Sequence, residues 1–254
     1  MTAKREPMPR NYYDSERAAS EYLWLHYGDP KPWPLTFPAG CVAECLDAER
    51  LPERARALDL GCAVGGGSFE LARHCKEVIG IDASRQFIEI AQRLRERGED
   101  RFNLYIEGEV TKPKRVVIPR GIDRKRATFE VGDAMRPRED LGTFDVVMMA
   151  NLIDRLPAPR RLLEQLPELL NRGGQLIITS PYTWLAEYTP RANWLGGFTR
   201  GGRPVRTFDT LKTILSPHFK LSQRRNISFL IREHARKFQL GIAEASVWVR
   251  RGTK

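Results

Sequence analysis

The run of residues 57–68, Ala-Leu-Asp-Leu-Gly-Cys-Ala-Val-Gly-Gly-Gly-Ser, constrains the fold more than any other part of the chain. An apolar stretch typical of a buried strand leads directly into a glycine-rich turn, and a helical pattern follows the turn. Glycine lets the backbone of such a turn approach a bound ligand closely. We therefore expect an open α/β sheet with a ligand site where its first strand ends.

From Arg54 onward, short apolar or β-branched runs alternate with amphipathic helical stretches, as in a parallel sheet with helical crossovers. The fold class predicted is α/β, with a doubly wound, mostly parallel seven-stranded sheet whose last two strands form an antiparallel pair. Residues 232–239, between those two strands, are expected to be loop or helix. The predicted strands are 57–60, 78–81, 128–131, 144–150, 175–180, 219–223 and 244–250.

With 254 residues, 41% of them hydrophobic, the chain can bury one large core, so residues 1–254 are predicted to form a single domain. Residues 1–53 are expected to form a helical cap at the N-terminus. Two segments read as insertions: a basic one at 101–126, and one at 182–207 on the substrate side, rich in Trp, Gly and Arg.

The net charge of +10 is concentrated rather than spread over the fold. Residues 101–126 hold eight Lys or Arg and three acids, so this segment alone supplies +5. A solvated hairpin face is the expected structure, because nucleic-acid binding needs a basic footprint distributed over a surface.

The chain is expected to be cytoplasmic, with no membrane partner. It has no run of 18 apolar residues, and Met1–Arg10 lack the apolar region of a secretion signal. The four cysteines and four histidines show no metal-ligand spacing, so no metal site is predicted and the cysteines are expected to be small buried hydrophobes.

An acidic residue stands at or just after the end of each of three predicted strands: Asp59, Asp82 and Asp133. The glycine spacing differs from the dinucleotide fingerprint, and the carboxylate of Asp59 would repel a pyrophosphate but suits the amino group of a methionine moiety. Asp82 is placed to accept the hydroxyls of a ribose, and Asp133 to bond an adenine amino group. The three ends should lie side by side at one edge of the sheet.

These motifs, followed by residues 144–151, Phe-Asp-Val-Val-Met-Met-Ala-Asn, resemble the motif series of class I S-adenosylmethionine-dependent methyltransferases. The resemblance implies a Rossmann-like fold and S-adenosylmethionine as cofactor. Ala63 stands where the family usually has the central glycine of its turn, which should narrow the turn. The cofactor-binding residues implied are Asp59, Gly61, Ala63, Gly65, Asp82, Ala83, Asp133, Ala134 and Asn151.

A longer resemblance runs from Tyr12 to Arg250. Residues 13–23, 57–65, 180–185, 193–198 and 229–238 are similar to the C-terminal methyltransferase domain of ovothiol-biosynthesis enzymes, which methylate 5-thiohistidine on a ring nitrogen. The sequence has no histidine cluster for the iron-dependent synthase half of that family. The resemblance therefore implies a histidine-derived small-molecule substrate, the thiohistidine or its selenium analogue, supplied by a separate enzyme.

Methyl transfer is an in-line displacement, so correct positioning of the acceptor against the methyl group can supply much of the catalysis. An imidazole nitrogen in the correct tautomer already has a free lone pair and needs no strong base. Asn151 and Tyr182, which follow the fourth and fifth strands, are the candidate catalytic residues. Tyr12, Tyr13 and Trp184 are candidate aromatic walls of the substrate site.

An arginine fork can hold an amino-acid carboxylate bidentately. Arg17, Arg155, Arg206 and Arg232 are the arginines available for this. Arg232, which interrupts an apolar run, is the preferred substrate clamp and Arg206 a further substrate-binding candidate, whereas Arg17 is assigned to the carboxylate of the cofactor.

Three alternative functions are compatible with the sequence. They are methylation of another small molecule, methylation of nucleic acid or protein gripped by the basic segment 101–126, and binding of the cofactor without catalysis. The fourth strand leads into Ala-Asn-Leu-Ile-Asp at 150–154, without the Asn/Asp-Pro-Pro-Tyr/Phe motif of many base-modifying relatives, so a nucleic-acid partner is disfavoured.

The sequence generates a first testable prediction, that catalysis requires no metal ion. Methyl transfer by the purified protein should proceed at an unchanged rate in excess EDTA. Loss of activity in the chelator, restored by one particular divalent ion, would contradict this.

Overall fold

The structure, a computed structural model, describes residues 12–28 and 37–252. Met1–Arg10, on which the expectation about a secretion signal partly depends, and part of the predicted cap over 1–53 lie outside the described residues. Within the described part, no helix is long and apolar enough to cross a bilayer.

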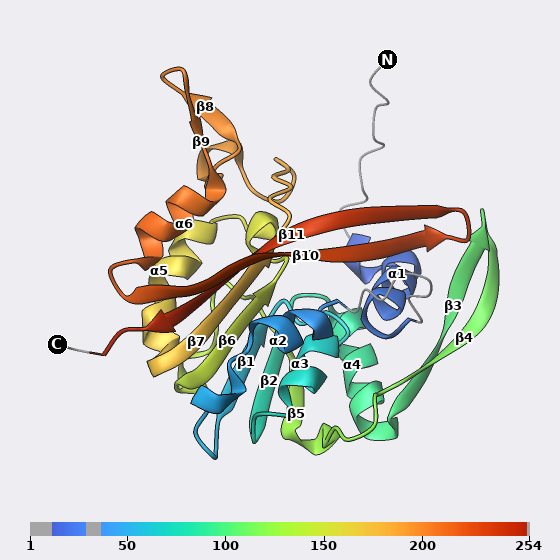
Figure 1. The fold of residues 1–254 in the computed structure, drawn as a ribbon. Coiled ribbons are helices and arrows are strands. Elements are labelled where there is room, and N and C mark those ends of the chain that lie inside the picture. The colour runs from blue at the N-terminus through green and yellow to red at the C-terminus, as the bar shows by residue number, and fades with distance from the viewer. Residues whose placement is uncertain (1–11, 29–36, 253–254) are drawn as a thin grey trace.

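One seven-stranded sheet organises the chain, in the order β10-β11-β7-β6-β1-β2-β5 (Figure 1). Five of its strands, β1, β2, β5, β6 and β7, are parallel, and β11 is antiparallel to both β7 and β10. This confirms the predicted fold class. The strands are β1 (Arg56–Leu60), β2 (Glu77–Asp82), β5 (Ala127–Val131), β6 (Phe144–Ala150), β7 (Leu170–Ser180), β10 (Phe219–His234) and β11 (Lys237–Arg250).

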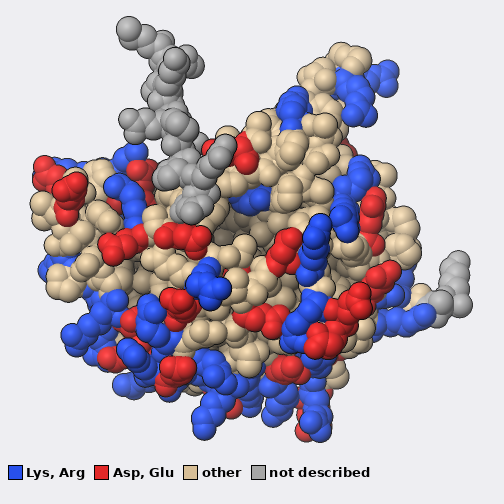
Figure 2. Space-filling view, turned by 180° about the vertical axis from the view of Figure 1, so that it is seen from behind, with Lys and Arg blue, Asp and Glu red and all other residues tan. Residues whose placement is uncertain are grey.

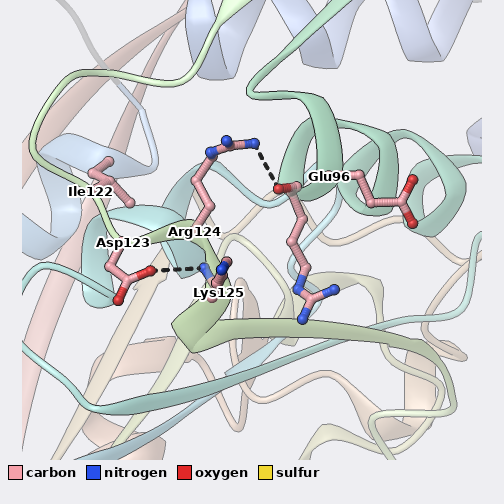
Figure 3. A pocket seen from close by; sticks show the side chains of 6 residues that line it. Glu96, Ile122, Asp123, Arg124 and Lys125 are labelled. Carbon is pink, nitrogen blue, oxygen red and sulfur yellow. Dashed lines mark hydrogen bonds between the residues drawn. The ribbon is translucent and has the colours of Figure 1, made fainter.

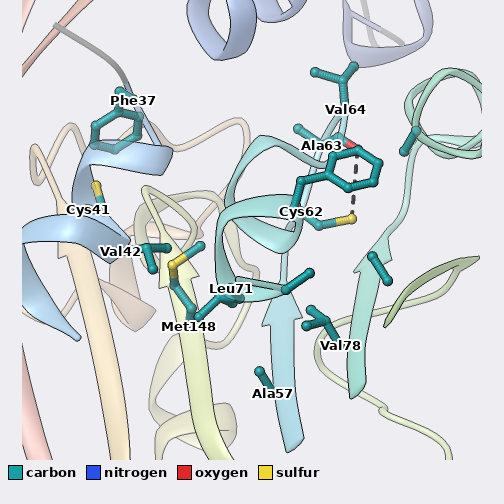
Figure 4. Close-up of a cluster of buried hydrophobic side chains, with 14 of the residues drawn as sticks. Phe37, Cys41, Val42, Ala57, Cys62, Ala63, Val64, Leu71, Val78 and Met148 are labelled. Carbon is teal, nitrogen blue, oxygen red and sulfur yellow. Dashed lines mark hydrogen bonds between the residues drawn. The ribbon is translucent and has the colours of Figure 1, made fainter. Parts of the chain in front are cut away.

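Helices cover both faces of the sheet, because successive strand residues point to opposite sides. Ala57 belongs to one core cluster, and its neighbour Leu58 to the other. The first cluster lies under α1 to α4, and Figure 4 shows Ala57, Val78 and Met148 on three strands, with Met148 beside Val42 of α2. The second lies under α5 and α6. The helices are α1 (Glu16–Tyr27), α2 (Ala39–Cys45), α3 (Gly66–Leu71), α4 (Arg85–Arg97), α5 (Pro159–Leu169) and α6 (Thr207–Leu215).

The direction of the connections reverses at β1. The chain steps from β1 to β2 and β5 on one side, and β6 and β7 lie on the other. In an open parallel sheet this reversal leaves a crevice at the carboxyl ends of the strands, where ligands bind. The glycine turn after β1 stands at this switch point.

The segment 232–239 is neither loop nor helix, so that expectation was wrong. Strand β10 continues to His234, the two residues 235–236 turn the chain, and β11 starts at Lys237. The β10–β11 hairpin extends past the edge of the sheet, because β7 pairs with β11 only from Glu244 to Val249. The extended part of β10 packs against α1 and the β3–β4 hairpin. These tertiary contacts stabilise a strand in a segment whose charged sequence does not predict one.

The basic segment forms a hairpin of β3 (Glu99–Glu107) and β4 (Val110–Val117) beside α1 and α4 (Figure 1). Val116 is buried against the first core cluster, whereas Lys112 and Lys114 are exposed. The hairpin has a packed face and a solvated basic face, as expected from its charges.

The second insertion, 182–207, carries a short hairpin of β8 (Phe198–Arg200) and β9 (Arg203–Val205) that projects above α6 in Figure 1. Arg206, at the end of this insertion, is exposed and occupies the N-cap position of α6. The insertion begins at the carboxyl end of β7, so only its first residues are close to the crevice.

Candidate active site

The glycine turn joins β1 to α3 at the switch point. The amides of Gly61 and Cys62 donate to the carbonyl of Ile81 at 2.8 and 3.1 Å, which holds the turn against β2. Gly65 has a φ of 85°, and a Cβ there would lie 2.8 Å from the ring of Phe129, so this position requires glycine. Ala63 also lies in the left-handed region, with a φ of 46°. The alanine found in place of the usual glycine is therefore a point of backbone strain.

The carboxylate of Asp82 ties this turn to the end of β2. One oxygen accepts from the Ala63 amide and the other from the Ser84 amide, both at 2.9 Å. Burial raises the pKa of Asp82, while these amides oppose the rise. Each carboxylate oxygen has a further lone pair, so Asp82 can still accept ribose hydroxyls.

Asp59 is the buried acid beneath the turn, with 1% of its surface exposed. One oxygen accepts from the Ser68 hydroxyl at 2.7 Å, while Oδ1 has no hydrogen-bond partner among the described residues. Burial raises the pKa of Asp59 to about 7. A buried, unpartnered carboxylate oxygen is costly, and the ammonium of an amino-acid ligand would supply both a donor and a counter-charge. This buried acceptor therefore fits the ammonium group at the methionine end of S-adenosylmethionine.

Asp133 and Ala134 follow β5 beside the same edge. The amide of Gly132 donates to the carbonyl of Asp82 at 2.9 Å, and Asp133 accepts from the Met135 amide at 2.8 Å. Asp133 and Ala83 are exposed and Ala134 is buried. The structure thus brings together the ends of β1, β2 and β5, as the three acidic motifs required.

The N-terminal segment, residues 12–28, covers the glycine turn. Nδ1 of His26 accepts from the Gly66 amide at 3.0 Å, and the hydroxyl of Tyr27 donates to the carbonyl of Val64 at 2.7 Å. Burial lowers the pKa of His26 to about 3, which keeps its ring neutral and able to accept. Sequence reasoning missed both residues, since nothing local marks which side of α1 meets the turn.

A separate group lies where the long β10–β11 hairpin meets the N-terminal segment: Tyr12, Arg17 and Arg232, the last on β10 itself. Tyr12 donates to Glu21, Arg17 lies 3.4 Å from Glu21, and the Arg17 guanidinium stands 5.2 Å from the ring centroid of Tyr105. Arg232, 8% exposed, donates from Nη1 to the Tyr105 carbonyl at 2.8 Å. These contacts join α1 to the two hairpins.

Asn151 and Tyr182 stand at the carboxyl ends of β6 and β7, with φ values of 54° and 53°. The Thr179 hydroxyl donates to Oδ1 of Asn151 at 3.0 Å, and the Tyr182 hydroxyl donates to Glu244 at 2.7 Å. With Ala63, they are the only non-glycine residues of the described chain with positive φ. Such conformations cost about 1–3 kcal/mol each and concentrate at functional sites.

Trp184 lies in the second core cluster, stacked on Trp194 and donating to the Thr207 hydroxyl at 2.9 Å. Its contacts are those of a packing residue.

Asp154 was not predicted as a site residue. It is fully buried and accepts from Ser180, from the Thr183 amide and from Arg155.

The basic segment leads to a cavity of about 450 Å³ at the far end of α4 (Figure 3). There Arg124 donates to the carbonyl of Arg95 at 2.7 Å and caps the helix. Helix α4 begins next to Asp82 and extends ~20 Å, so this cavity is remote from the glycine turn. Within the described ranges, no three His, Cys, Asp or Glu residues are grouped as a metal site would require.

A family model described as "Methyltransferase domain" matches residues 38–217, more than half of the chain. The chain therefore belongs to this family. Together with the fold, the match confirms the predicted resemblance to class I S-adenosylmethionine-dependent methyltransferases at the level of the domain.

Curated relatives include a ubiquinone biosynthesis O-methyltransferase of Alkalilimnicola ehrlichii, 29% identical over 67% of this chain and 61% of the relative. A magnesium-protoporphyrin O-methyltransferase of Rhodobacter capsulatus is 31% identical over 57% and 58%. An ajmaline N-methyltransferase of Rauvolfia serpentina is 27% identical over 55% and 40%. The matches span about 40–60% of these relatives' own lengths.

Solved structures share the fold at low identity. Magnesium protoporphyrin IX methyltransferase of Synechocystis PCC 6803, with bound S-adenosylhomocysteine, has a TM-score of 0.52 at 18% identity, covering 96% of this chain and 98% of that one. The N-methyltransferase NodS of Bradyrhizobium japonicum, also with S-adenosylhomocysteine, has a TM-score of 0.51 at 17% identity, covering 92% and 98%.

The state of Asp59 predicts how cofactor binding depends on pH. Its carboxyl has a pKa of about 7, and only the ionised form attracts an ammonium, so S-adenosylhomocysteine should bind more tightly as pH rises from 5.5 to 7.5. Asp59→Asn should remove this dependence and weaken binding at pH 7.5 by about 10- to 100-fold. Calorimetry measures both, with the exposed Asp209→Asn as control. An affinity of the unaltered protein that is independent of pH would count against the contact.

The strain at Ala63 predicts a stabilising substitution. Ala63→Gly should raise the free energy of unfolding by about 1 kcal/mol, because glycine adopts a φ of 46° without a Cβ clash. Ala43→Gly, on the exposed side of α2, should instead lower it by about 1 kcal/mol. Urea denaturation of the two variants decides the matter, and a destabilised Ala63→Gly protein would be the contrary result.

Proposed function

We propose that this enzyme transfers a methyl group from S-adenosylmethionine to a small molecule bound between the N-terminal segment and the carboxyl ends of β6 and β7. The observation that carries the proposal is the placement of Ala63, Asn151 and Tyr182. These three strained positions lie at the carboxyl ends of β1, β6 and β7, where the parallel sheet has its crevice. A non-catalytic scaffold would have no need of strain at the two ends that face the acceptor.

Cofactor binding would use the residues already described. Asp59 would hold the amino group, Asp82 the ribose and the glycine turn the methionine chain, with Asp133 and Ala134 beside the adenine. The sulfonium supplies an activated methyl group: the acceptor's lone pair forms the new bond to carbon as the carbon–sulfur bond breaks and the sulfur becomes a neutral thioether.

Asn151 and Tyr182 would orient the acceptor. Oδ1 of Asn151 is engaged by Thr179, so its amide NH₂ is the part that can donate to a ligand. Burial and the hydrogen bond to Glu244 raise the pKa of Tyr182 above its usual value. Tyr182 therefore stays protonated near neutral pH and acts as a hydrogen-bonding group rather than a base, which suits an acceptor atom that already has a free lone pair.

We propose that the methyl acceptor is a histidine-derived small molecule. The relatives named for ubiquinone, magnesium-protoporphyrin and ajmaline favour small-molecule methylation in general. The long sequence resemblance favours a ring nitrogen of 5-thiohistidine, or its selenium analogue, delivered by a separate synthase. Nucleic acid is disfavoured because the basic cavity lies at the far end of α4. We propose a cytoplasmic location, with which four free buried cysteines agree.

Mass spectrometry tests the proposed reaction. The purified protein is incubated with S-adenosylmethionine and, in parallel, with histidine, 5-thiohistidine, 5-selenohistidine, a catechol or RNA. We expect one added methyl group on the imidazole ring of the thio or seleno compound. Methylation of the catechol alone would keep the enzyme class and exclude this acceptor, and methylated RNA would contradict the small-molecule proposal.

A matched pair of variants tests the role of Asn151. Asn151→Ala should lower kcat by about 100-fold, because one preorganised donor is lost. Asn226→Ala, exposed on β10, should leave kcat unchanged. Equal activity of the two variants would remove Asn151 from the catalytic site.

A further inference from the structure

We propose that Arg155, framed by Tyr13 and Tyr188, binds a carboxylate of the methyl acceptor, so that the enzyme selects small molecules that carry an acid group. This inference rests on the proposed function and names a substrate class for the same site. It also moves the clamp from Arg232, the arginine favoured by the sequence, to a residue at the carboxyl edge of the sheet.

Arg155 is fixed where an acceptor must approach. It ends the short 3-10 helix Ile153–Arg155, which directly follows β6 and the strained Asn151. Its Nη1 lies 2.9 Å from the carbonyl of Thr183, in the segment that follows β7 and the strained Tyr182. One guanidinium thus bridges the two strand ends that carry the candidate catalytic residues.

Asp154 sets the orientation of this guanidinium. Its buried carboxylate accepts from Ser180, from the Thr183 amide and from Nη1 of Arg155, at 2.8–3.1 Å. The hydrogen bonds that the structure gives Arg155 within the described residues all use Nη1. The Arg155 side chain is 24% exposed, whereas that of Asp154 is 0% exposed. The pair therefore has a buried negative end and a partly exposed positive end. Nε and Nη2 make none of these bonds, and the Tyr13 side chain is the remaining hydrogen-bonding neighbour of the guanidinium.

Two tyrosines line the accessible end. The Arg155 guanidinium lies 5.1 Å from the ring centroid of Tyr188, and that ring lies 5.9 Å from the ring of Tyr13. Burial lowers the pKa of Arg155, but Asp154 and then Tyr13 raise it above the ordinary value. A permanently charged guanidinium beside two phenol rings is suited to a planar carboxylate.

The same tyrosines connect this site to the cofactor. Ser84, whose amide donates to Asp82, has its hydroxyl 2.9 Å from the Tyr13 carbonyl. The ring of Tyr13 lies 5.9 Å from that of Tyr188, which contacts Arg155, so Tyr13 links the Arg155 site to Ser84 and through it to Asp82. An acceptor held by Arg155 would therefore lie on the same side of the N-terminal segment as the ribose acid. Figure 2 shows a hollow on the rear face of the molecule, with basic atoms on its floor.

The other candidate arginines are engaged differently. Arg17 is paired with Glu21, and Arg232 is buried against Tyr105 under the long hairpin. Arg206 is exposed at the start of α6. Of the four, Arg155 alone combines a fixed orientation with contacts to the carboxyl ends of β6 and β7.

A carboxylate at Arg155 could belong to the acceptor or to the cofactor, and binding measurements separate the two. The protein, with and without saturating S-adenosylhomocysteine, is titrated with 5-thiohistidine and with 5-thiohistamine, which lacks the carboxylate. We expect the acid to bind about 10- to 100-fold more tightly than the amine. Arg155→Lys should abolish this preference and leave the affinity for S-adenosylhomocysteine unchanged, since lysine keeps the charge but not the fork.

Arg161→Lys on α5 and Arg232→Lys serve as controls and should keep the preference. Folding of each variant is checked by its melting temperature. Should Arg155→Lys not fold, the acid–amine comparison on the unaltered protein still decides. Equal binding of acid and amine, binding of neither, or a preference lost in Arg232→Lys instead would overturn the proposal, as would a loss confined to S-adenosylhomocysteine. Failure of S-adenosylhomocysteine to bind the unaltered protein would count against the proposed function, while the titrations without it still test the clamp.

Discussion

The two hydrogen bonds of the Asp82 carboxylate hold the centre of this structure together. One fixes the amide of Ala63 in the glycine turn, and the other fixes the amide of Ser84 at the start of α4. Ser84 then meets the carbonyl of Tyr13, so a single acid at the end of β2 coordinates a turn, a helix and the N-terminal segment. Because the carboxylate is partly removed from solvent, the two amides replace hydrogen bonds that it would otherwise make to water. The conformation of the cofactor turn and the closure over it therefore depend on the same residue.

Closure of the site is made by parts of the chain that are distant in sequence. Helix α1 contacts the glycine turn through His26 and Tyr27, and it is held from outside by the β3–β4 and β10–β11 hairpins. Arg232 and Arg17 meet at Tyr105 in this outer layer. The long hairpin thus stabilises the cover of the site, and an arginine that looked like a substrate ligand has the contacts of a structural one.

Two buried carboxylates, Asp59 and Asp154, have different electrostatic roles in the crevice. One oxygen of Asp59 has no hydrogen-bond partner in the described part of the chain, and its raised pKa reflects burial without a counter-charge, so this position suits a cationic group. Asp154 is satisfied by three donors and holds Arg155 with its positive end accessible. A ligand ammonium on one side and an acceptor carboxylate on the other would each meet an opposite charge. The strained residues Asn151 and Tyr182 stand beside the Asp154–Arg155 pair, at the ends of β6 and β7.

The sequence alone determined the strands of the parallel sheet, the glycine turn and the alignment of Asp59, Asp82 and Asp133. Each depends on local signals: apolar runs of strand length, glycine where φ must be positive, and an acid at the end of a strand. Only the tertiary structure decided that 232–239 continues a hairpin and that Arg232, on this hairpin, is buried against Tyr105. It also decided that His26 contacts the glycine turn and that Asp154, Arg155 and Tyr188 lie together. Those outcomes depend on which distant segment supplies a hydrogen-bond partner or an apolar surface. The spacing of residues along the chain does not encode that pairing, because it is fixed when the whole core packs.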